Sequence, residues 1–307
     1  MVHRLMNKYK EENKKMLKIG ITEKVYCSKY GFKNGLERMK KHGYDALDYL
    51  EFANTETPLF EKNSSEFEAY LKEQKKIAEN CGIEIFQTHG PWRWPLQDFT
   101  KEDREERFEK MSRSIVGTTI LGCRNFVIHP IMPFTTHDEE HKRETYEMNV
   151  EFMERLKNVG RENDVVICLE NMPMPRFSLG SVPAILEFVK VMNSEYFKVC
   201  FDTGHATFFE LSVGDAVRLL GKEYLYTLHI HDNDGNGDKH WEPFRGLIDW
   251  EDFGHALHEI QYDGVVSLEA NLPKLPDELC EMEEIALCRK AQYIAALAAG
   301  RGRRNDE

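Results

Sequence analysis

The stretch FKVCFDTGHA, residues 197–206, joins a short apolar run to two ionisable side chains, Asp202 and His205. Its length and its β-branched and aromatic content are typical of a buried strand, after which the chain turns into a helix. Further runs of this kind recur along the chain, separated by longer charged segments of helical period. The eight runs cover residues 16–22, 44–50, 83–90, 124–130, 165–171, 197–205, 225–232 and 264–271.

The segments between the runs indicate one helix for each strand. Residues 65–82 have an amphipathic pattern with Gly82 as a helix stop, and residues 144–161 repeat the pattern. The runs are apolar on both sides of the pleat, as expected for strands between a barrel interior and a layer of helices. We therefore predict an α/β protein with a (β/α)8 TIM barrel as a single domain over residues 16–300. A doubly wound open sheet is the alternative, but the G-x-G-x-x-G fingerprint that it would favour is absent after the early strands.

Composition narrows the class of protein. The chain has 307 residues, 41% of them hydrophobic, which is enough for one sizeable core. A net charge of -12 argues against a protein that coats nucleic acid or anionic membranes. Residues 1–15 are predicted to be a polar N-terminal lead-in, since they lack the apolar segment of a secretory signal, and no stretch approaches a membrane span. We expect a cytoplasmic protein.

The seven cysteines give no sign of a disulfide scaffold. Their number is odd, no C-x-x-C pair occurs, and several lie inside apolar runs, as Cys168 and Cys200 do. Reduced cysteine behaves there as a small hydrophobic residue.

Six of the eight runs end in a side chain that binds metals or moves protons. In a TIM barrel the carboxyl ends of all strands meet at one face. Singly, each residue is also typical of a helix cap or a surface charge. Together, buried charges would repel one another without a cation, so the set predicts a metal centre. The six residues are His89, His129, Glu170, Asp202, His229 and Glu269.

The ligand chemistry limits the choice of metal. Carboxylates and imidazoles without thiolates suit Mn²⁺, Zn²⁺, Co²⁺ or Fe²⁺, and no organic cofactor is needed. Asp202 and His205 are three residues apart at a turn, so both can face the site. His229 and His231 lie two apart on one strand, so one is expected to be a ligand and the other a supporting or substrate contact.

Aromatic side chains are frequent in the segments expected to face a substrate, whereas basic residues are scattered. Aromatic faces suit the C–H surfaces of a small sugar or polyol, while DNA would need a basic track, so nucleic acid is an unlikely partner. The segment 232–250 is the longest irregular piece and follows the seventh run. The aromatic residues are Trp92, Trp94, Phe134, Phe177, Phe208, Phe209, Trp241 and Phe244, and the bases are Arg93, Arg176, Lys239 and Arg245.

Six motifs resemble the xylose isomerase-like TIM-barrel superfamily: THGPW, FVIHP, LENMP, CFDTGHA, LHIHDND and SLEAN. The resemblance runs from about Leu17 to the last helix. In the sugar epimerase branch it implies one metal ion held by Glu170, Asp202, His229 and Glu269. In the branch of type IV abasic-site endonucleases it implies a trinuclear zinc site, with His89, His129, His205, Asp238 and His240 as further ligands. All nine positions are filled, so the ligand set leaves both branches open.

The leading hypothesis is a metal-dependent sugar isomerase or epimerase that acts through an enediolate, with Glu170 and Glu269 as the proton-transfer pair. The alternatives are an abasic-site endonuclease, a sugar or cyclitol dehydratase or lyase, and a barrel that only binds sugar or metal. No basic phosphate nest follows the last two strands, which favours a non-phosphorylated substrate. The C-terminal helix leaves a homo-oligomer open. Expected substrate contacts are His205, His231, Trp241, Arg245 and Trp92.

Overall fold

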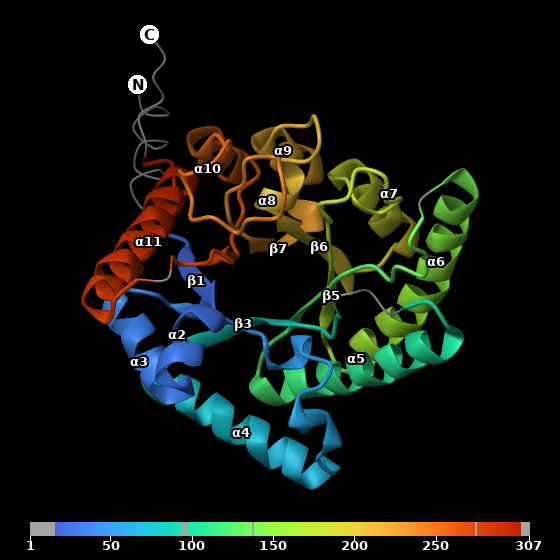
Figure 1. Cartoon of the computed structure of the whole chain (residues 1–307), viewed down its shortest axis with the longest axis horizontal. Helices are drawn as coiled ribbons and strands as arrows, with labels where there is room; N and C mark the ends of the chain where they lie inside the picture. Colours follow the sequence, from blue (N-terminus) through green and yellow to red (C-terminus); the bar gives the residue numbers. More distant parts are fainter. Residues whose placement is uncertain (1–15, 94–97, 137, 274, 302–307) are drawn as a thin grey trace, which may run out of the picture.

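The computed structural model describes residues 16–93, 98–136, 138–273 and 275–301. The predicted lead-in over residues 1–15 lies outside this part, as does Trp94. Eight parallel strands form the centre of the molecule, each within one of the eight predicted runs (Figure 1). The strands are β1 (Lys18–Thr22), β2 (Ala46–Tyr49), β3 (Glu84–His89), β4 (Asn125–Ile128), β5 (Val166–Glu170), β6 (Phe197–Asp202), β7 (Leu225–His229) and β8 (Val265–Leu268).

The strands follow one another around a nearly closed barrel in the order β7-β6-β5-β4-β3-β2-β1-β8. The gap between β7 and β8 is bridged at one point, where Ile230 pairs in parallel with Leu268. The Ile230 amide donates to the Ser267 carbonyl and the Glu269 amide donates to the Ile230 carbonyl, both at 2.9 Å. A single-domain TIM barrel is thus confirmed, and the doubly wound open sheet is excluded because β7 and β8, the two end strands of this order, meet at Ile230 and Leu268.

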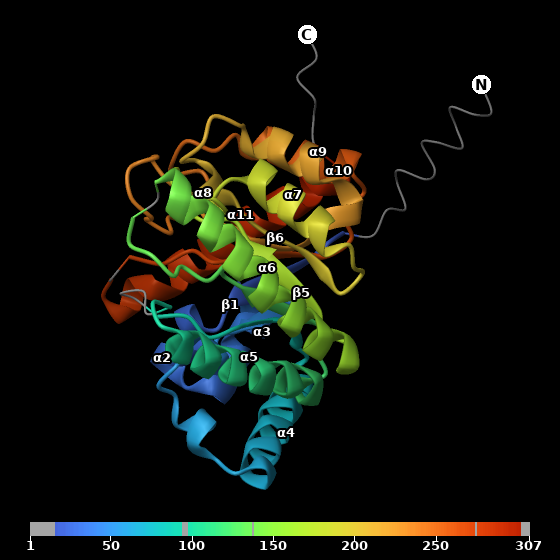
Figure 2. The ribbon, with the colours of Figure 1, turned by 90° about the vertical axis from the view of Figure 1, so that its right-hand side faces the viewer.

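Helices surround the barrel, and each main helix packs on the next until α11 meets α3 (Figure 1). Figure 2 shows α4, α5, α6 and α7 following one another along one side. Two short 3-10 helices, η1 (Glu51–Ala53) and η2 (Pro58–Glu61), lie after β2. The α-helices are α2 (Lys24–Tyr30), α3 (Phe32–His42), α4 (Ser64–Cys81), α5 (Lys101–Leu121), α6 (Glu139–Glu162), α7 (Val182–Met192), α8 (Thr203–Ala206), α9 (Val213–Tyr224), α10 (Trp250–Glu259) and α11 (Asp277–Ala298).

Local sequence signals set the helix boundaries. At the start of α4, Asn63 and Glu66 form a capping box that satisfies amides at the helix N-terminus. The helix ends at Gly82, which has the left-handed conformation (φ 68°) that glycine adopts without strain. The helix therefore stops at Gly82, as predicted. The helix predicted around residues 144–161 is also present, as part of the longer α6.

Alternate residues of the strands face two different apolar layers. The larger one joins the outer faces of the strands to the helices. The smaller one contains only strand residues, Val127, Val166, Cys168 and Cys200, and so lies inside the barrel. Because side chains alternate along a strand, residues that continue this inner series at the carboxyl ends point into the barrel mouth. His129, Glu170 and Asp202 continue it.

All seven cysteines lie in the described part of the chain and are free, as expected from their spacing. No helix among the described residues is long and apolar enough to span a membrane.

Candidate metal centre

Four side chains converge at the carboxyl ends of β5 to β8. Glu170, Asp202 and His229 are the last residues of their strands, and Glu269 directly follows β8. One ligand atom from each lies within 4.8 Å of those from the other three. The first three side chains are buried, and that of Glu269 is 21% exposed. The sequence places this set at the strand ends, and the structure brings it together.

His229 is oriented by a buried carboxylate from across the barrel. Its Nε2 lies 2.9 Å from Oδ2 of Asp48, which also accepts a 3.0 Å hydrogen bond from Nε2 of Gln87. Asp48 therefore favours the tautomer in which Nε2 carries the proton and Nδ1 presents a lone pair. Nδ1 of His229 is buried, has no hydrogen-bond partner among the described residues, and faces Glu170 Oε1 at 3.2 Å and Glu269 Oε2 at 3.0 Å.

A lone pair that faces two carboxylate oxygens needs a proton or a cation between them. Oε2 of Glu170 is likewise buried without a hydrogen-bond partner among the residues described. The arrangement and its oxygen and nitrogen donors fit a divalent ion held by Glu170, Asp202, His229 and Glu269.

Two further histidines face the other side of Glu170. Nε2 of His89 lies 3.5 Å and Nε2 of His129 lies 3.3 Å from Glu170 Oε2. Nδ1 of His89 is 2.9 Å from the Gly90 carbonyl, which leaves its Nε2 free to act as a ligand. His89, Glu170 and His229 form a second group of candidate ligand atoms within 4.8 Å of one another.

A third group lies beside Asp202 and contains His205, His231, Asp238 and His240. Oδ2 of Asp238 lies 3.4 Å from Nε2 of His205 and 3.0 Å from Nε2 of His240. Nδ1 of His205 lies 2.8 Å from the Asn171 carbonyl oxygen, and Nδ1 of His240 lies 2.8 Å from the Glu269 carbonyl oxygen. All nine residues expected as ligands therefore meet in one mouth.

The carboxylates and imidazoles of the centre shift one another's pKa values. Burial raises the pKa of Glu170, but the charges of His229 and His129 outweigh it and hold this pKa well below 4.5. Burial lowers the pKa of His205, but the charge of Asp202 and the hydrogen bond to Asp238 outweigh it and raise this pKa to about 10. Burial also lowers the pKa of His240, but its hydrogen bond to Asp238 outweighs this effect and raises the pKa to about 9. A bound cation would meet the same electrostatic demand.

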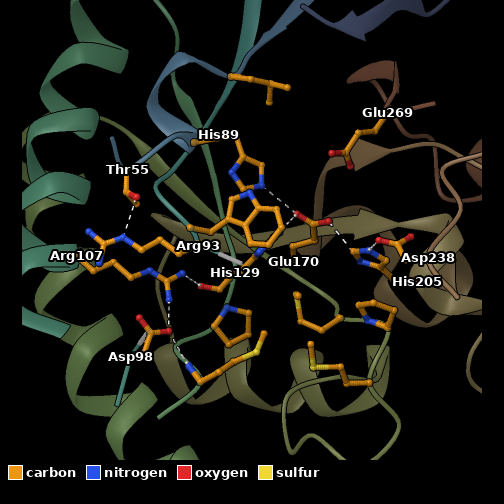
Figure 3. A pocket seen from close by; sticks show the side chains of 18 of the residues that line it. Thr55, His89, Arg93, Asp98, Arg107, His129, Glu170, His205, Asp238 and Glu269 are labelled. Atoms are coloured by element: carbon orange, nitrogen blue, oxygen red, sulfur yellow. Dashed lines mark hydrogen bonds and ion pairs between the residues drawn. The ribbon is translucent and has the colours of Figure 1, made fainter. Parts of the chain in front are cut away.

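The centre opens into a cavity of about 530 Å³ (Figure 3). Figure 3 shows Glu170 between His89 and His129 on one side and His205 on the other. The rest of the cavity is lined by apolar side chains and by charged side chains. The apolar residues are Leu50, Ala53, Trp92, Met132, Met172, Met174 and Phe208, and the charged residues are Lys24, Arg93, Asp98, Asp103, Arg107 and Lys110.

Of the expected substrate contacts, His205 and Trp92 line the cavity, and His231, Trp241 and Arg245 are not among the residues that line it. His231 is fully buried, with Nε2 3.0 Å from Asp202 Oδ2. The Arg245 guanidinium lies over the Trp241 ring, 4.9 Å from its centroid. Segment 232–250 folds back on itself, because Asp232 pairs with Trp241 and its side chain accepts from the Arg245 amide.

Sequence reasoning missed Asp48, Gln87 and Arg107. Asp48 lies inside its apolar run, and its alignment with Gln87 follows only from the β2–β3 register. The one signal was an acidic residue at an inward position of a buried strand. The expected aromatic residues Phe134, Phe177, Phe209 and Phe244 are not among those that line the cavity, nor are Arg176 and Lys239.

Residues 36–291 match the family model described as Xylose isomerase-like TIM barrel. A D-psicose 3-epimerase from Ruminiclostridium cellulolyticum is 27% identical over 245 residues, which is 78% of each chain. The crystal structure of D-psicose 3-epimerase with D-tagatose from Clostridium cellulolyticum H10 has a TM-score of 0.74 at 21% identity and covers 91% of this chain and 99% of that one.

The crystal structure of the IOLI protein with a zinc atom has a TM-score of 0.72 at 19% identity over 91% of this chain and 98% of that one. These likenesses under 25% identity support the fold alone, whereas the family model spans most of the chain. The chain therefore belongs to the xylose isomerase-like TIM-barrel family.

Proposed function

We propose that the protein is a divalent-metal-dependent enzyme that isomerises or epimerises a sugar by moving a proton at the carbon beside a carbonyl group. One observation carries the proposal. Glu170 and Glu269 approach the same atom, Nδ1 of His229, from β5 and from the end of β8, at 3.2 and 3.0 Å. Both carboxylates also line the cavity, so they can flank a carbon bound there.

The proposal gives the residues of the centre two roles, which are metal binding and proton transfer. Glu170, Asp202, His229 and Glu269 would hold one Mn²⁺, Zn²⁺ or Co²⁺ ion, with no organic cofactor. When bound, the ion supplies positive charge that stabilises the oxygen on which negative charge develops. Of the carboxylates of Glu170 and Glu269, one removes the proton and the other returns it.

The cavity wall supports a sugar or polyol as the substrate. Trp92 and Phe208 offer aromatic faces, and Met132 and Met174 offer adaptable apolar surface, all of which suit C–H groups. His205 lies at the metal end as a hydrogen-bonding contact. The names of the relatives, which include sugar epimerases, agree with this substrate class. We expect the enzyme to act in the cytoplasm. A homo-oligomer is compatible with this proposal.

Abasic-site DNA cleavage is the second candidate, because the nine residues expected for a trinuclear site lie around one mouth. In that case these residues would hold three zinc ions, which would supply an activated water and neutralise charge on a phosphodiester. A DNA backbone needs a basic track, however, and three of the four lysine and arginine side chains on the cavity wall are paired with acids: Arg93 and Lys110 share Glu106, and Arg107 binds Asp98. This pairing favours the sugar.

Deuterium exchange tests the proposal. Metal-loaded protein is incubated in heavy water with a panel of ketohexoses, and exchange of the hydrogen beside the carbonyl is followed by NMR. We expect exchange in the wild type and in Glu210→Gln, an exposed control, and at least about a hundredfold slower exchange in Glu170→Gln and Glu269→Gln.

The same variants separate the alternatives. A protein that only binds sugar would show no exchange, and Glu170→Gln would leave its sugar affinity unchanged. A dehydratase would lose a hydroxyl group from the substrate. Absence of exchange across the panel would contradict the proposal, and cleavage of an abasic duplex would favour the endonuclease instead.

A further inference from the structure

Arg107 of α5 is a buried arginine, 8% exposed, in the wall of the cavity. All three of its guanidinium nitrogens donate to buried acceptors. Nη1 donates to Asp98 Oδ2 at 2.5 Å, Nε to the Pro91 carbonyl at 3.2 Å, and Nη2 to the His129 carbonyl at 3.1 Å. Figure 3 shows Arg107 beside Asp98 and His129. A planar fork with fixed donor directions is needed to reach three acceptors at once.

These contacts tie together the loops that follow β3 and β4. Pro91 comes two residues after His89, and His129 is held through its own carbonyl. Asp98 Oδ2 also accepts from the Met132 amide at 3.0 Å, so the same ion pair holds the β4 loop at a second point. The β3–β4 ladder ends at His89 and Val127. Arg107 therefore fixes the backbone beyond the point where the ladder ends.

The two loops carry the histidines that face Glu170. Their rings meet edge to face with centroids 4.9 Å apart, and both Nε2 atoms approach Glu170 Oε2. Since both imidazoles lie on the Oε2 side of the carboxylate, Oε1 of Glu170 points toward His229 Nδ1. The Glu170 carboxylate is both a metal ligand and a member of the proton-transfer pair in the proposed function. Its direction thus depends on where the loops that carry His89 and His129 lie.

We infer that Arg107 is a positioning residue of the metal centre, which aligns Glu170 by fixing His89 and His129. The inference rests on the proposed function, since it assigns Arg107 a role only if Glu170 is a ligand. Lysine in its place keeps the positive charge but cannot hold both carbonyls and Asp98. Loss of residues that orient ligands typically weakens metal binding about 10- to 100-fold.

Arg113 provides a matched control on the same helix. Its Nη1 donates to the Phe60 carbonyl at 2.7 Å and its Nη2 donates to the Lys62 carbonyl. Its guanidinium also lies 4.4 Å from the centroid of the Phe67 ring. Neither carbonyl belongs to a residue that lines the cavity. Arg113→Lys therefore removes the same kind of contact while leaving the histidine loops in place.

The test is a Co²⁺ titration of the metal-stripped full-length chain, followed by visible absorption, with a melting temperature for each variant. We expect Arg107→Lys to weaken Co²⁺ binding about 10- to 100-fold and to change the absorption bands, with Arg113→Lys binding as the wild type does. If Arg107→Lys does not fold, Asp98→Asn is titrated instead, since it weakens the same clamp without changing side-chain volume. Weaker Co²⁺ binding in either variant supports the inference.

Unchanged Co²⁺ binding in the folded variant would overturn the role of Arg107 while leaving the proposed function intact. Equal weakening in Arg113→Lys would also overturn it, because general destabilisation would then explain both. A wild type that binds no Co²⁺ would contradict both the metal centre and this inference. Binding without sugar exchange would contradict the proposed function alone.

Discussion

Nε2 of His229 lies 2.9 Å from Oδ2 of Asp48, and both side chains are fully buried. This contact joins the end of β7 to β2 on the opposite part of the barrel. It fixes which ring nitrogen carries the proton and so leaves Nδ1 toward Glu170 and Glu269. A carboxylate behind a histidine also raises the basicity of that histidine as a ligand.

Asp48→Asn should weaken metal binding about 10- to 100-fold, because the amide keeps the shape but removes the charge behind His229. Calorimetric titration with Mn²⁺ or Zn²⁺ measures the change. Asp45→Asn is the control, since Asp45 accepts from the Ile19 amide and lies just before β2, at the opposite end from the centre. Equal affinities in Asp48→Asn and the wild type would show that Asp48 does not orient a ligand.

Metal binding should stabilise the folded chain. A ligand that binds only the folded state at about 100 times its Kd adds about 2.7 kcal/mol to the free energy of unfolding. We therefore expect EDTA to lower the melting temperature and added Mn²⁺ or Co²⁺ to restore it. The gain should be lost in Asp202→Asn, which removes a buried ligand. A melting temperature that does not respond to either treatment would argue against a resident ion.

Glu23, directly after β1, should make stability fall as pH rises. Burial, together with the nearby Glu51 carboxylate, raises its pKa from 4.5 to about 8. Since the folded pKa exceeds the unfolded one, the folded chain holds an extra proton between these values, and that stabilisation is lost as pH rises through about 8.

Glu23→Gln keeps an oxygen that can accept from the Leu50 amide but cannot ionise. Urea unfolding at pH 5 and pH 9 should show the variant to be less sensitive to pH than the wild type and more stable at pH 9. Glu56→Gln, an exposed control in the next loop, should behave like the wild type. Identical pH slopes in all three would contradict the assignment.

His205 and His240 give the metal-free chain a second pH dependence. Their pKa values, about 10 and about 9, lie above the ordinary 6.5, so their contribution is complete below about pH 6.5 and is lost as pH rises through 9 to 10. Asp238→Asn should lower both pKa values, because Asp238 bonds to both rings. Proton NMR titration of the ring C–H signals measures the shift, and unchanged midpoints would rule out this pairing.

The barrel could be predicted from the sequence because a strand buried on both sides needs an apolar run, and the eight runs are spaced by helical segments. Glu170, Asp202 and His229 could be predicted because each interrupts such a run at its carboxyl end. Asp48 could not, since only the register of β2 against β3 sets it beside Gln87 and below His229.

Two other features depend on tertiary contacts that leave no pattern in the sequence. Arg107 lies in the highly charged segment KEDREERFEK, where an arginine ordinarily faces water, yet the loops after β3 and β4 fold over it. Trp241 and Arg245 lie in the loop expected to reach the substrate. The part of the loop that contains them is instead held by Asp232, whose carboxylate accepts from the Ile248 amide and the Trp250 indole.

Metal content with anomalous scattering at the centre tests the central claim most directly. Full-length protein is loaded with Mn²⁺ or Co²⁺, dialysed and crystallised, and the ions are counted and placed. The account predicts one ion per chain, bound by Glu170, Asp202, His229 and Glu269, and its loss in Glu170→Gln. Three zinc ions spread over all nine residues, or no ion between these four, would contradict it.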